Sequence, residues 1–419
     1  MNNYSIFIPH AGELYAGSAR KKVFEQVKNI KYIIYLAAIH EISERNFYIL
    51  HKDDNFDLEL NLKKYNKSEH SYEWVEPELN KYYPDALKLV IAPTDYHDKY
   101  LGILDKIIKF FNNHDNVLLI ATSDLTHYDK STNDILIYPQ QLSKIILEEE
   151  IINNLINHKY TKNNIICGPY ATDSFCYINK KLNYTPGIVL DYYDSSNYDL
   201  YGIDKYVINP TKIINHLVSY VSIIYNKKIT SNFDDIIALG IIKSIFLQQL
   251  YDKKYEYKLR LPIWSKYCTH NTDHSVFVGT SLNDRVNSCT GSYDYNTSEN
   301  IIRAANSCIR DSIYRWNNPI TLNNINILVI KIDILDSKKD WIELQDYMKE
   351  FILDGSYGVY LKLYNGLSAT YLPSVAKDYK WTKKSYIESL CEKAGGDKSD
   401  WMNKNTRIYT YRVRTVSSD

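Results

Sequence analysis

Three histidines follow short apolar runs that have the composition of β-strands. The three pairs are Tyr4–Ile8 before His10, Tyr32–Ala37 before His40, and Asn116–Ala121 before His127. The carboxyl ends of strands in an open α/β sheet converge on one edge, where ligands bind. Residues far apart in the sequence can therefore meet there. Imidazole serves both as a metal ligand and as a general acid or base. The pattern thus favours a functional site at this edge over a chance placement.

A fourth candidate for this site is Cys167, which precedes Gly168 and Pro169. Proline suits the first turn of a helix, so we expect a helix to begin here. The dipole of a helix stabilises a thiolate at its N-terminus. We therefore expect a lowered pKa for Cys167, which would make it a better ligand or nucleophile. The alternative is a buried and inert cysteine.

Two further polar residues are placed to support the site. Asp124 could accept a hydrogen bond from the second ring nitrogen of a ligating histidine. His70 lies between Glu69 and Glu73 in a loop that could orient a substrate or a ligating imidazole. For both Asp124 and His70, the alternative is a plain role in a helix cap or a turn.

A cysteine in the second half of the chain is a candidate for a second site. Cys289 lies in the segment Arg285–Gly291, which we predict to be a turn after the strand around Val276. It would act as a nucleophile or as a thiol that contacts a peptide. No general base is adjacent in sequence, so a structural role has more weight. His270 and His274 could become partners only through the fold.

The elements that position these residues change in character along the chain. The first half alternates strands with helices, which predicts an α/β domain with a largely parallel or mixed sheet. Helices are expected at Ser18–Val27, with Ser18 as the N-cap, and at Tyr100–Asn112. Further strands are expected at Ala86–Ala92, Gly187–Tyr192 and Leu217–Tyr225. We place the domain boundary near residue 229, after a polar joint at Asn226–Thr230, which gives domains 1–228 and 229–419.

The second half has an α+β pattern. Its helices are expected at Asp234–Leu250 and at Thr382–Lys393, with Thr382 as the cap and Gly395 as the stop. Asn365-Gly366 predicts a two-residue hairpin turn. The strands expected in this half are Ser275–Thr280, Asn326–Ile334, Val359–Leu363, Ser368–Leu372 and Arg407–Val413.

Composition limits the function classes. The 419 residues include 50 basic and 50 acidic side chains, so net charge gives no reason to expect a nucleic-acid or membrane-surface partner. The six cysteines lack CxxC spacing, which implies neither a disulfide framework nor a zinc ribbon. No signal peptide and no membrane-spanning apolar stretch is recognised. We therefore expect a cytoplasmic protein with reduced thiols.

The first half, roughly residues 1–226, resembles the Memo family. The segments that carry the resemblance are Pro9-His10-Ala11-Gly12, Leu36 to His40, Glu69 to Glu73, Thr122 to Tyr128, Cys167-Gly168, Tyr193 to Ser196, and Val218-Ser219-Tyr220. Memo proteins share the fold of class III extradiol dioxygenases and bind a single iron or copper ion. The resemblance implies that His10, His40 and Cys167 are the metal ligands. It also implies that His127 is an acid/base group or an additional ligand, and that Asp124 and His70 line the pocket.

The sequence departs from the family pattern in two places. The family usually has a second histidine where this chain has Glu41, which would alter the charge of the pocket or offer an oxygen ligand. The family's Ala-Gly-Ser-Trp-Tyr segment before the first strand is missing. Both departures leave the expected ligands in place.

Two imidazoles and one thiolate suit copper, zinc or iron(II). Extradiol ring cleavage normally uses two histidines and a carboxylate. A thiolate in place of the carboxylate favours softer or lower-valent metals, so ordinary catechol dioxygenase activity is not expected. The leading hypothesis is metal-dependent redox chemistry on a small-molecule or protein-bound substrate. The alternatives are a non-catalytic adaptor that binds peptides and a protein that sequesters metal.

The second half, roughly residues 232–419, resembles the AMMECR family, which is an α+β fold. The matching segments are Gly355–Gly358, Ala369 to Lys377, Trp381, Leu390 to Gly395, and Cys289-Thr290-Gly291, with Ser288 in place of the family's glycine. Memo-like, AMMECR-like and radical-SAM proteins recur together in AmmeMemoRadiSam systems. This chain lacks a CxxxCxxC motif, so a radical-SAM partner would be a separate protein. A fusion of the two domains suggests that both act on one substrate or hand one on.

Overall fold

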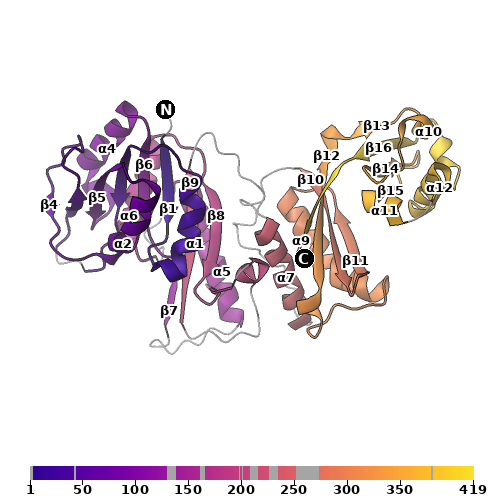
Figure 1. Cartoon of the computed structure of the whole chain (residues 1–419), viewed down its shortest axis with the longest axis horizontal. Coiled ribbons are helices and arrows are strands. Elements are labelled where there is room, and N and C mark those ends of the chain that lie inside the picture. The colour runs from indigo at the N-terminus through magenta and orange to yellow at the C-terminus, as the bar shows by residue number, and fades with distance from the viewer. Residues whose placement is uncertain are drawn as a thin grey trace. The chain divides into compact units, whose positions relative to one another are not determined.

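The computed structural model describes residues 3–41, 44–129, 138–160, 166–197, 199–200, 202–207, 216–225, 235–251, 273–378 and 381–419. These residues form two compact units (Figure 1). Unit 1 holds the described residues up to 244, and unit 2 holds the described residues from 245 onward. The predicted boundary near residue 229 and the joint Asn226–Thr230 lie outside the described ranges and stay predictions. None of the helices in these ranges has the length and hydropathy that a membrane-spanning segment requires.

Unit 1 is built on a mixed sheet, which in the described part of the chain has nine strands in the order β4-β3-β5-β2-β6-β1-β9-β7, with β8 paired to β9. The strands are β1 (Tyr4–Ile8), β2 (Tyr32–Leu36), β3 (Phe47–Lys52), β4 (Lys63–Lys64), β5 (Leu87–Pro93), β6 (Val117–Thr122), β7 (His127–Asp129), β8 (Ile188–Asp194) and β9 (His216–Tyr225). The central strands β1, β6, β2 and β5 run parallel. Their carboxyl ends therefore share one edge, as predicted.

The strands predicted from apolar runs in this half are confirmed, with bounds that differ by at most two residues. All six residues of β6 are buried, because helices cover both faces of the sheet. The helices of unit 1 are α1 (Glu13–Phe24), α2 (His70–Glu73), α3 (Glu76–Tyr82), α4 (Leu101–Asn113), α5 (Tyr138–Ile156) and α6 (Pro169–Lys181), together with the part of α7 (Asp235–Tyr251) that ends at Ser244.

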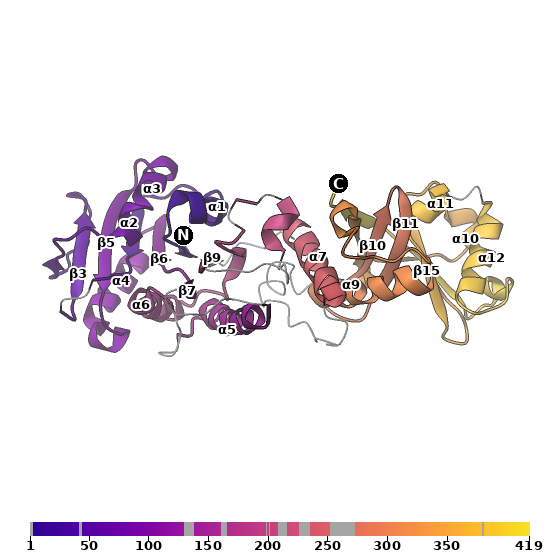
Figure 2. The ribbon, with the colours of Figure 1, turned by 90° about the horizontal axis from the view of Figure 1, so that it is seen from below.

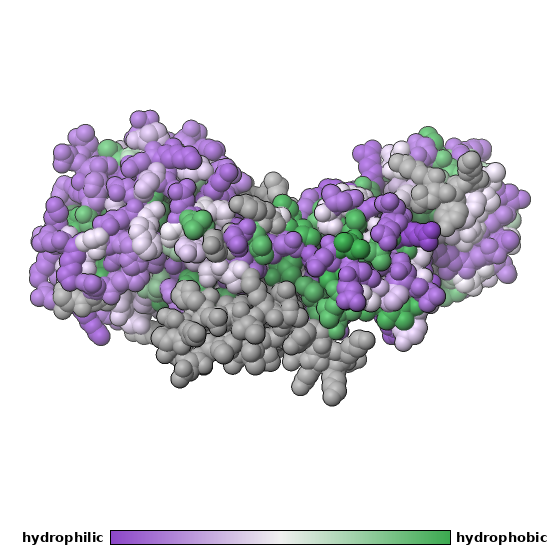
Figure 3. Space-filling view, turned by 60° about the horizontal axis from the view of Figure 1, so that its bottom comes forward, coloured by the Kyte–Doolittle hydropathy of each residue, from purple (hydrophilic) through white to green (hydrophobic). Residues whose placement is uncertain are grey.

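The two faces of the sheet carry different helices. Val23 and Phe24 of α1 pack with Leu79 of α3 against the face that includes Ile6. The ring of Phe175 in α6 packs at a tilt against Phe7, whose side chain points to the opposite face. Figure 2 shows α1, α2 and α3 on one side of the strands and α4, α5 and α6 on the other. Hydrophilic residues cover most of the face of unit 1 visible in Figure 3, which agrees with a core buried on both sides of the sheet.

The predicted start of the first helix is wrong. We expected an N-cap at Ser18, but α1 begins at Glu13 and its N-cap is Gly12. The Gly12 carbonyl accepts hydrogen bonds from the next turn, and the charge of Glu13 suits a helix N-terminus. Ser18 Oγ instead donates to the hydroxyl of Tyr193 at 2.8 Å. The helix predicted at Tyr100–Asn112 is confirmed as α4.

Unit 2 contains two four-stranded antiparallel sheets in the described ranges, with orders β11-β10-β12-β17 and β13-β16-β14-β15. The strands are β10 (His274–Leu282), β11 (Arg285–Ser292), β12 (Val329–Ser337), β13 (Ile342–Glu343), β14 (Gly358–Lys362), β15 (Ser368–Tyr371), β16 (Arg407–Tyr411) and β17 (Val413–Ser417). The helices are the rest of α7, α9 (Thr297–Tyr314), α10 (Tyr347–Glu350), α11 (Pro373–Asp378) and α12 (Lys383–Lys393). This is an α+β arrangement, as predicted. Thr382 caps α12, and Gly395 has a φ of +85° after its end, which confirms both expectations.

One local prediction in unit 2 is wrong, and two are confirmed only in part. The segment Arg285–Gly291 is not a turn but most of strand β11, because Asn283 and Asp284 have positive φ angles and close a tight hairpin before it. The hairpin at Asn365-Gly366 has a longer loop, in which the amide of Gly366 donates to the carbonyl of Leu363. The final strand is interrupted at Arg412, and β16 and β17 belong to different sheets.

Candidate metal centre

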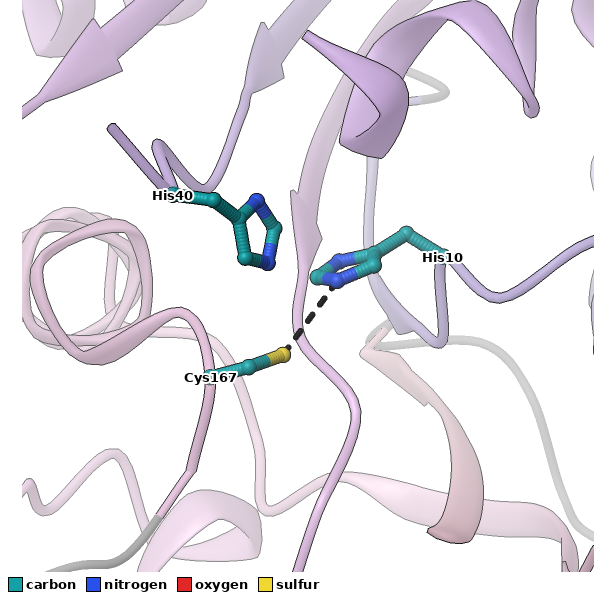
Figure 4. A group of neighbouring side chains, drawn as sticks. All are labelled: His10, His40 and Cys167. Atoms are coloured by element: carbon teal, nitrogen blue, oxygen red, sulfur yellow. Dashed lines mark hydrogen bonds between the residues drawn. The ribbon is translucent and has the colours of Figure 1, made fainter. Parts of the chain in front are cut away.

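The structure brings His10, His40 and Cys167 together at the predicted edge of the sheet. One ligand atom from each residue lies within 4.8 Å of the others. His10 follows β1, His40 follows β2, and Cys167 lies two residues before α6. The three side chains point toward one another in Figure 4, and Cys167 Sγ lies 3.3 Å from His10 Nε2. Strand ends and a helix start therefore converge on one point, as the sequence predicts.

His10 is buried, with 2% of its surface exposed. Both its ring and its backbone amide make polar contacts. Its Nδ1 lies 3.1 Å from Thr122 Oγ1, and its backbone amide donates to Asp124 Oδ1 at 2.9 Å. We expected Asp124 to accept from a ring nitrogen, but this carboxylate fixes the loop and Thr122 contacts the ring. Burial and the nearby His40 and His70 lower the pKa of His10 well below its usual value. A neutral imidazole is the form that binds a metal.

A buried arginine also holds the His10 loop. Arg20 Nη1 donates to the carbonyls of Pro9, at 3.3 Å, and Ala11, at 2.6 Å, the residues on either side of His10. Glu78 accepts from Arg20 in turn, with Nε at 2.9 Å from Oε1, and Arg20 is fully buried. This contact links residues 58 positions apart in sequence, so sequence reasoning gave no signal for it.

The imidazole of His40 is oriented by Glu69. Glu69 Oε1 lies 2.8 Å from His40 Nδ1, and Glu69 Oε2 accepts from the backbone amide of His40 at 3.0 Å. The amide of Ser71 donates to Oε1 at 3.1 Å. Burial acts to raise the pKa of Glu69, but these hydrogen bonds outweigh it and lower the pKa. With Nδ1 engaged by a carboxylate, Nε2 of His40 remains for a ligand. The sequence placed Glu69 beside His70 and in the matching segment Glu69–Glu73, but it gave no sign of the contact with His40.

The thiol of Cys167 accepts a hydrogen bond from the amide of Asp124 at 2.9 Å and lies 3.5 Å from Ser123 Oγ. The predicted start of a helix at Pro169 is confirmed. The predicted lowering of the pKa is not observed. Burial, together with the negative charge of Asp124, raises the pKa of Cys167 and outweighs the helix dipole. A thiolate at this position needs a nearby positive charge, which a metal cation would supply.

Two further groups of potential ligands adjoin the first. His40, Glu69 and His70 form one, and Asp124, His127 and Cys167 form the other, each with ligand atoms within 4.8 Å. His70 and His127 therefore lie at the same edge of the sheet as the central group. The His70 ring lies 4.0 Å from that of His40, centroid to centroid. On its other side, the His70 ring lies 4.6 Å from the half-exposed ring of Trp74.

The structure does not bring Glu41 into any of these groups. Its side chain is exposed, and Oε2 accepts from Lys67 Nζ at 2.9 Å. In unit 2, Cys289 pairs with Gly279 across β10 and β11, whereas His274 lies at the far end of β10. The Nδ1 atom of His274 lies 2.6 Å from the carbonyl of Leu335, so it is not a base for Cys289. His270 lies outside the described residues.

The central donor set fits a soft or borderline transition metal. Two imidazoles and one thiol are the donors that copper, zinc and iron(II) accept. Each ring already has a partner on Nδ1, which is the usual support for a ligating histidine. Three protein donors leave coordination positions for substrate, which distinguishes catalytic from closed structural sites.

Comparison with known proteins identifies the C-terminal region. The AMMECR1 family model matches residues 242–416. The chain therefore carries an AMMECR1 domain that follows a mixed α/β unit. Protein TV1384 of Thermoplasma volcanium is 27% identical over 144 residues, which is 33% of this chain and 70% of that protein. Protein Ta0236 of Thermoplasma acidophilum is 26% identical over 145 residues, which is 33% of this chain and 68% of that protein.

Two solved structures are similar to parts of the chain. The uncharacterized protein PH0010 from Pyrococcus horikoshii is 18% identical, with a TM-score of 0.36, over 46% of this chain and 94% of that chain. The uncharacterized protein JW3007 from Escherichia coli K12 is 12% identical, with a TM-score of 0.32, over 53% of this chain and 99% of that chain. Similarities this weak carry no argument about the site.

Proposed function

We propose that unit 1 is a Memo-type domain, with the extradiol dioxygenase-like fold, that binds one iron or copper ion for redox chemistry. In this proposal His10, His40 and Cys167 are the ligands, and the domain spans residues 1–228. Zinc fits the same donors but lacks redox chemistry. The substrate would be a small molecule or a protein-bound group. The AMMECR1 domain, from residue 229, would present or receive that substrate, and a separate radical-SAM protein would be a partner.

The observation that carries the proposal is the convergence of three donor atoms within 4.8 Å at the carboxyl edge of the sheet. The support around them strengthens it. Thr122 contacts the His10 ring and Glu69 contacts the His40 ring, each through Nδ1. A fold that used these residues only for packing would not need such contacts on both rings. A bound iron or copper ion would supply one-electron chemistry at this position.

The neighbouring residues have distinct proposed roles. His127 is exposed and lies with Asp124 and Cys167, so it would exchange protons with a bound substrate or act as an additional ligand. Asp124 would fix the position of the His10 loop relative to the Cys167 thiol, since it contacts both. His70 would line the approach to the site from the side of Trp74.

Absorption spectroscopy of the copper(II)- or cobalt(II)-loaded protein tests the ligand set. We expect a thiolate-to-metal charge-transfer band that disappears in Cys167→Ser and persists in Cys176→Ser, whose buried thiol lies outside the three ligand groups. Absence of the band in the loaded wild-type protein would rule out Cys167 as a ligand.

Redox function is tested separately from binding. The iron- or copper-loaded protein is mixed with dioxygen and with electron donors of graded potential, and oxygen consumption and the metal spectrum are followed. Cycling between two metal oxidation states supports a redox enzyme. A stable spectrum and no oxygen consumption with any donor would favour metal sequestration instead.

A further inference from the structure

The second sheet of unit 2, with the strand order β13-β16-β14-β15, has helices on one face only. On that face, α10 and α12 pack against Val359, Leu361 and Ile408. Side chains alternate between the two faces along each strand, so the residues next to these three point the other way. Among the described residues, the apolar cluster on this second face includes no helix side chain. The first sheet covers one end of it at Tyr411, and we call the remainder the open face.

Three aromatic rings lie together on the open face. Tyr360 on β14 and Tyr409 on β16 are directly opposite each other on the two central strands, with ring centroids 6.3 Å apart. The ring of Trp341, just before β13, lies 5.2 Å from the ring of Tyr360 and 6.5 Å from the ring of Tyr409. Its indole nitrogen donates to the carbonyl of Asp336 at 2.8 Å, which orients the ring. All three side chains are partly exposed, so a planar group from solvent can contact them.

Charged side chains border these rings on the same face. The four strands contain three charged residues, Glu343, Lys362 and Arg407. Lys362 and Arg407 are directly opposite each other, two residues along each strand from the Tyr360–Tyr409 pair. Like charges in this arrangement destabilise a sheet. Arg407 Nη1 lies 3.2 Å from Glu343 Oε1, whereas the exposed Lys362 has no ion pair within the described part of the chain. The strands therefore give the open face a net positive charge beside its rings.

Rings and cations together narrow the class of ligand. An aromatic surface alone would suit a quaternary ammonium group as well as a planar ring. The net positive charge of the open face disfavours a cation and favours a phosphate group. A nucleotide combines a phosphate with a planar base, and neighbouring aromatic rings on the central strands of a sheet offer stacking positions for successive bases. Composition gave no signal for this face because the net charge of the whole chain is zero.

We propose that the open face binds a single-stranded oligonucleotide. Two successive bases would stack on Tyr360 and Tyr409 beside Trp341, and Lys362 and Arg407 would contact the phosphates. The side chain of Arg407 is 54% exposed and has several donors, so it can contact a phosphate and stay next to Glu343. The proposal is independent of the metal centre in unit 1.

Fluorescence anisotropy of a short labelled strand tests the stacking positions on the full-length protein. We expect a dissociation constant of about 1–100 μM at low salt for both RNA and DNA, and weaker binding of the duplex, whose bases are not free to stack. Tyr360→Leu and Tyr409→Leu should each weaken binding about fivefold or more, the loss of one stacked base. Tyr360→Phe keeps the ring and should retain the affinity. Tyr314→Leu, which removes an exposed tyrosine on α9, is the matched control.

Salt dependence tests the phosphate contacts separately. Lys362→Gln and Arg407→Gln should each reduce the slope of log affinity against log salt concentration by about 0.7, the value for one phosphate contact in a single strand. Lys384→Gln is the matched control, because it removes an exposed lysine of α12, which lies on the other face of the sheet. It should leave the slope unchanged.

Photochemical cross-linking to a strand that carries 5-iodouridine locates the bound bases. We expect adducts on the tryptic fragments 350–362 and 408–412, which contain Tyr360 and Tyr409. Tighter binding of RNA or of DNA identifies the preferred sugar and supports the proposal in either case. No binding of either strand at about 100 μM protein, equal affinities for strand and duplex, or wild-type affinity in both leucine variants would overturn the proposal.

Discussion

The role of Glu69 gives the most specific prediction about the metal centre. Glu69→Gln keeps the shape of the side chain but replaces one of its two acceptor oxygens with an amide group. In the wild-type protein the carboxylate accepts two hydrogen bonds from His40, one from Nδ1 (2.8 Å) and one from the backbone amide (3.0 Å). The glutamine can satisfy only one of them. Loss of such support around a metal ligand typically weakens metal affinity by about 10- to 100-fold, or about 1.4–2.7 kcal/mol.

The matched control is Glu73→Gln, which changes an exposed carboxylate four residues away that accepts from Ser68. Affinity is measured by competition with a chelator of known strength, on protein whose circular dichroism shows an intact fold. We expect Glu69→Gln to weaken binding at least about tenfold and Glu73→Gln to leave it within about twofold. Equal affinities for wild type and Glu69→Gln would refute the idea that Glu69 prepares His40 for a metal.

Three further predictions concern stability and thiol reactivity. Arg20→Met should lower the free energy of unfolding by about 3–5 kcal/mol in urea titrations, because it strips a buried ion pair of one partner, whereas Lys21→Met on the surface should cost under about 1 kcal/mol. Gly358→Ala should destabilise by about 1–3 kcal/mol, since its Cβ would overlap the ring of Tyr411, while Gly102→Ala in open space should stabilise by roughly 0.5–1 kcal/mol. Burial raises the pKa of Cys289 to about 11, so its alkylation rate should still climb tenfold per pH unit between about pH 9 and 10, where an unfolded chain's thiol levels off. Equal free energies of unfolding for Arg20→Met and Lys21→Met, or for Gly358→Ala and Gly102→Ala, would contradict the packing argument. A plateau of the alkylation rate near pH 9 would contradict the burial of Cys289.

The sequence was sufficient for six of the nine strands described in unit 1, and β1, β2 and β6 among them are continuous apolar runs buried on both faces. The strands β3, β4 and β7 were not predicted. The sequence was also sufficient to bring His10 and His40 to one edge, since parallel strands end together. The hydrogen bonds that orient the histidine rings could not be predicted in the same way. Glu69 meets His40 across 29 positions, and no local pattern marks that contact.

The errors also have physical causes. Strand β11 was predicted to be a turn because its Asn, Ser, Thr and Gly residues are typical of loops, whereas pairing with β10 decides the outcome. The start of α1 was missed because Gly12 lacks a capping side chain. The pKa of Cys167 was predicted from the helix dipole alone, and burial, which depends on tertiary packing, proved the larger effect.

The metal content of the protein as purified, without added metal, decides whether unit 1 holds a metal ion, and inductively coupled plasma mass spectrometry measures it. The account predicts about one iron or copper per chain in the wild-type protein and in His114→Ala, which alters a histidine bound to Asp57 away from the site. It predicts loss of that metal in the double variant His10→Ala/Cys167→Ser. No stoichiometric metal in the wild-type protein, even after anaerobic loading with iron(II) or copper(I), would contradict the account and leave a non-catalytic adaptor as the better description.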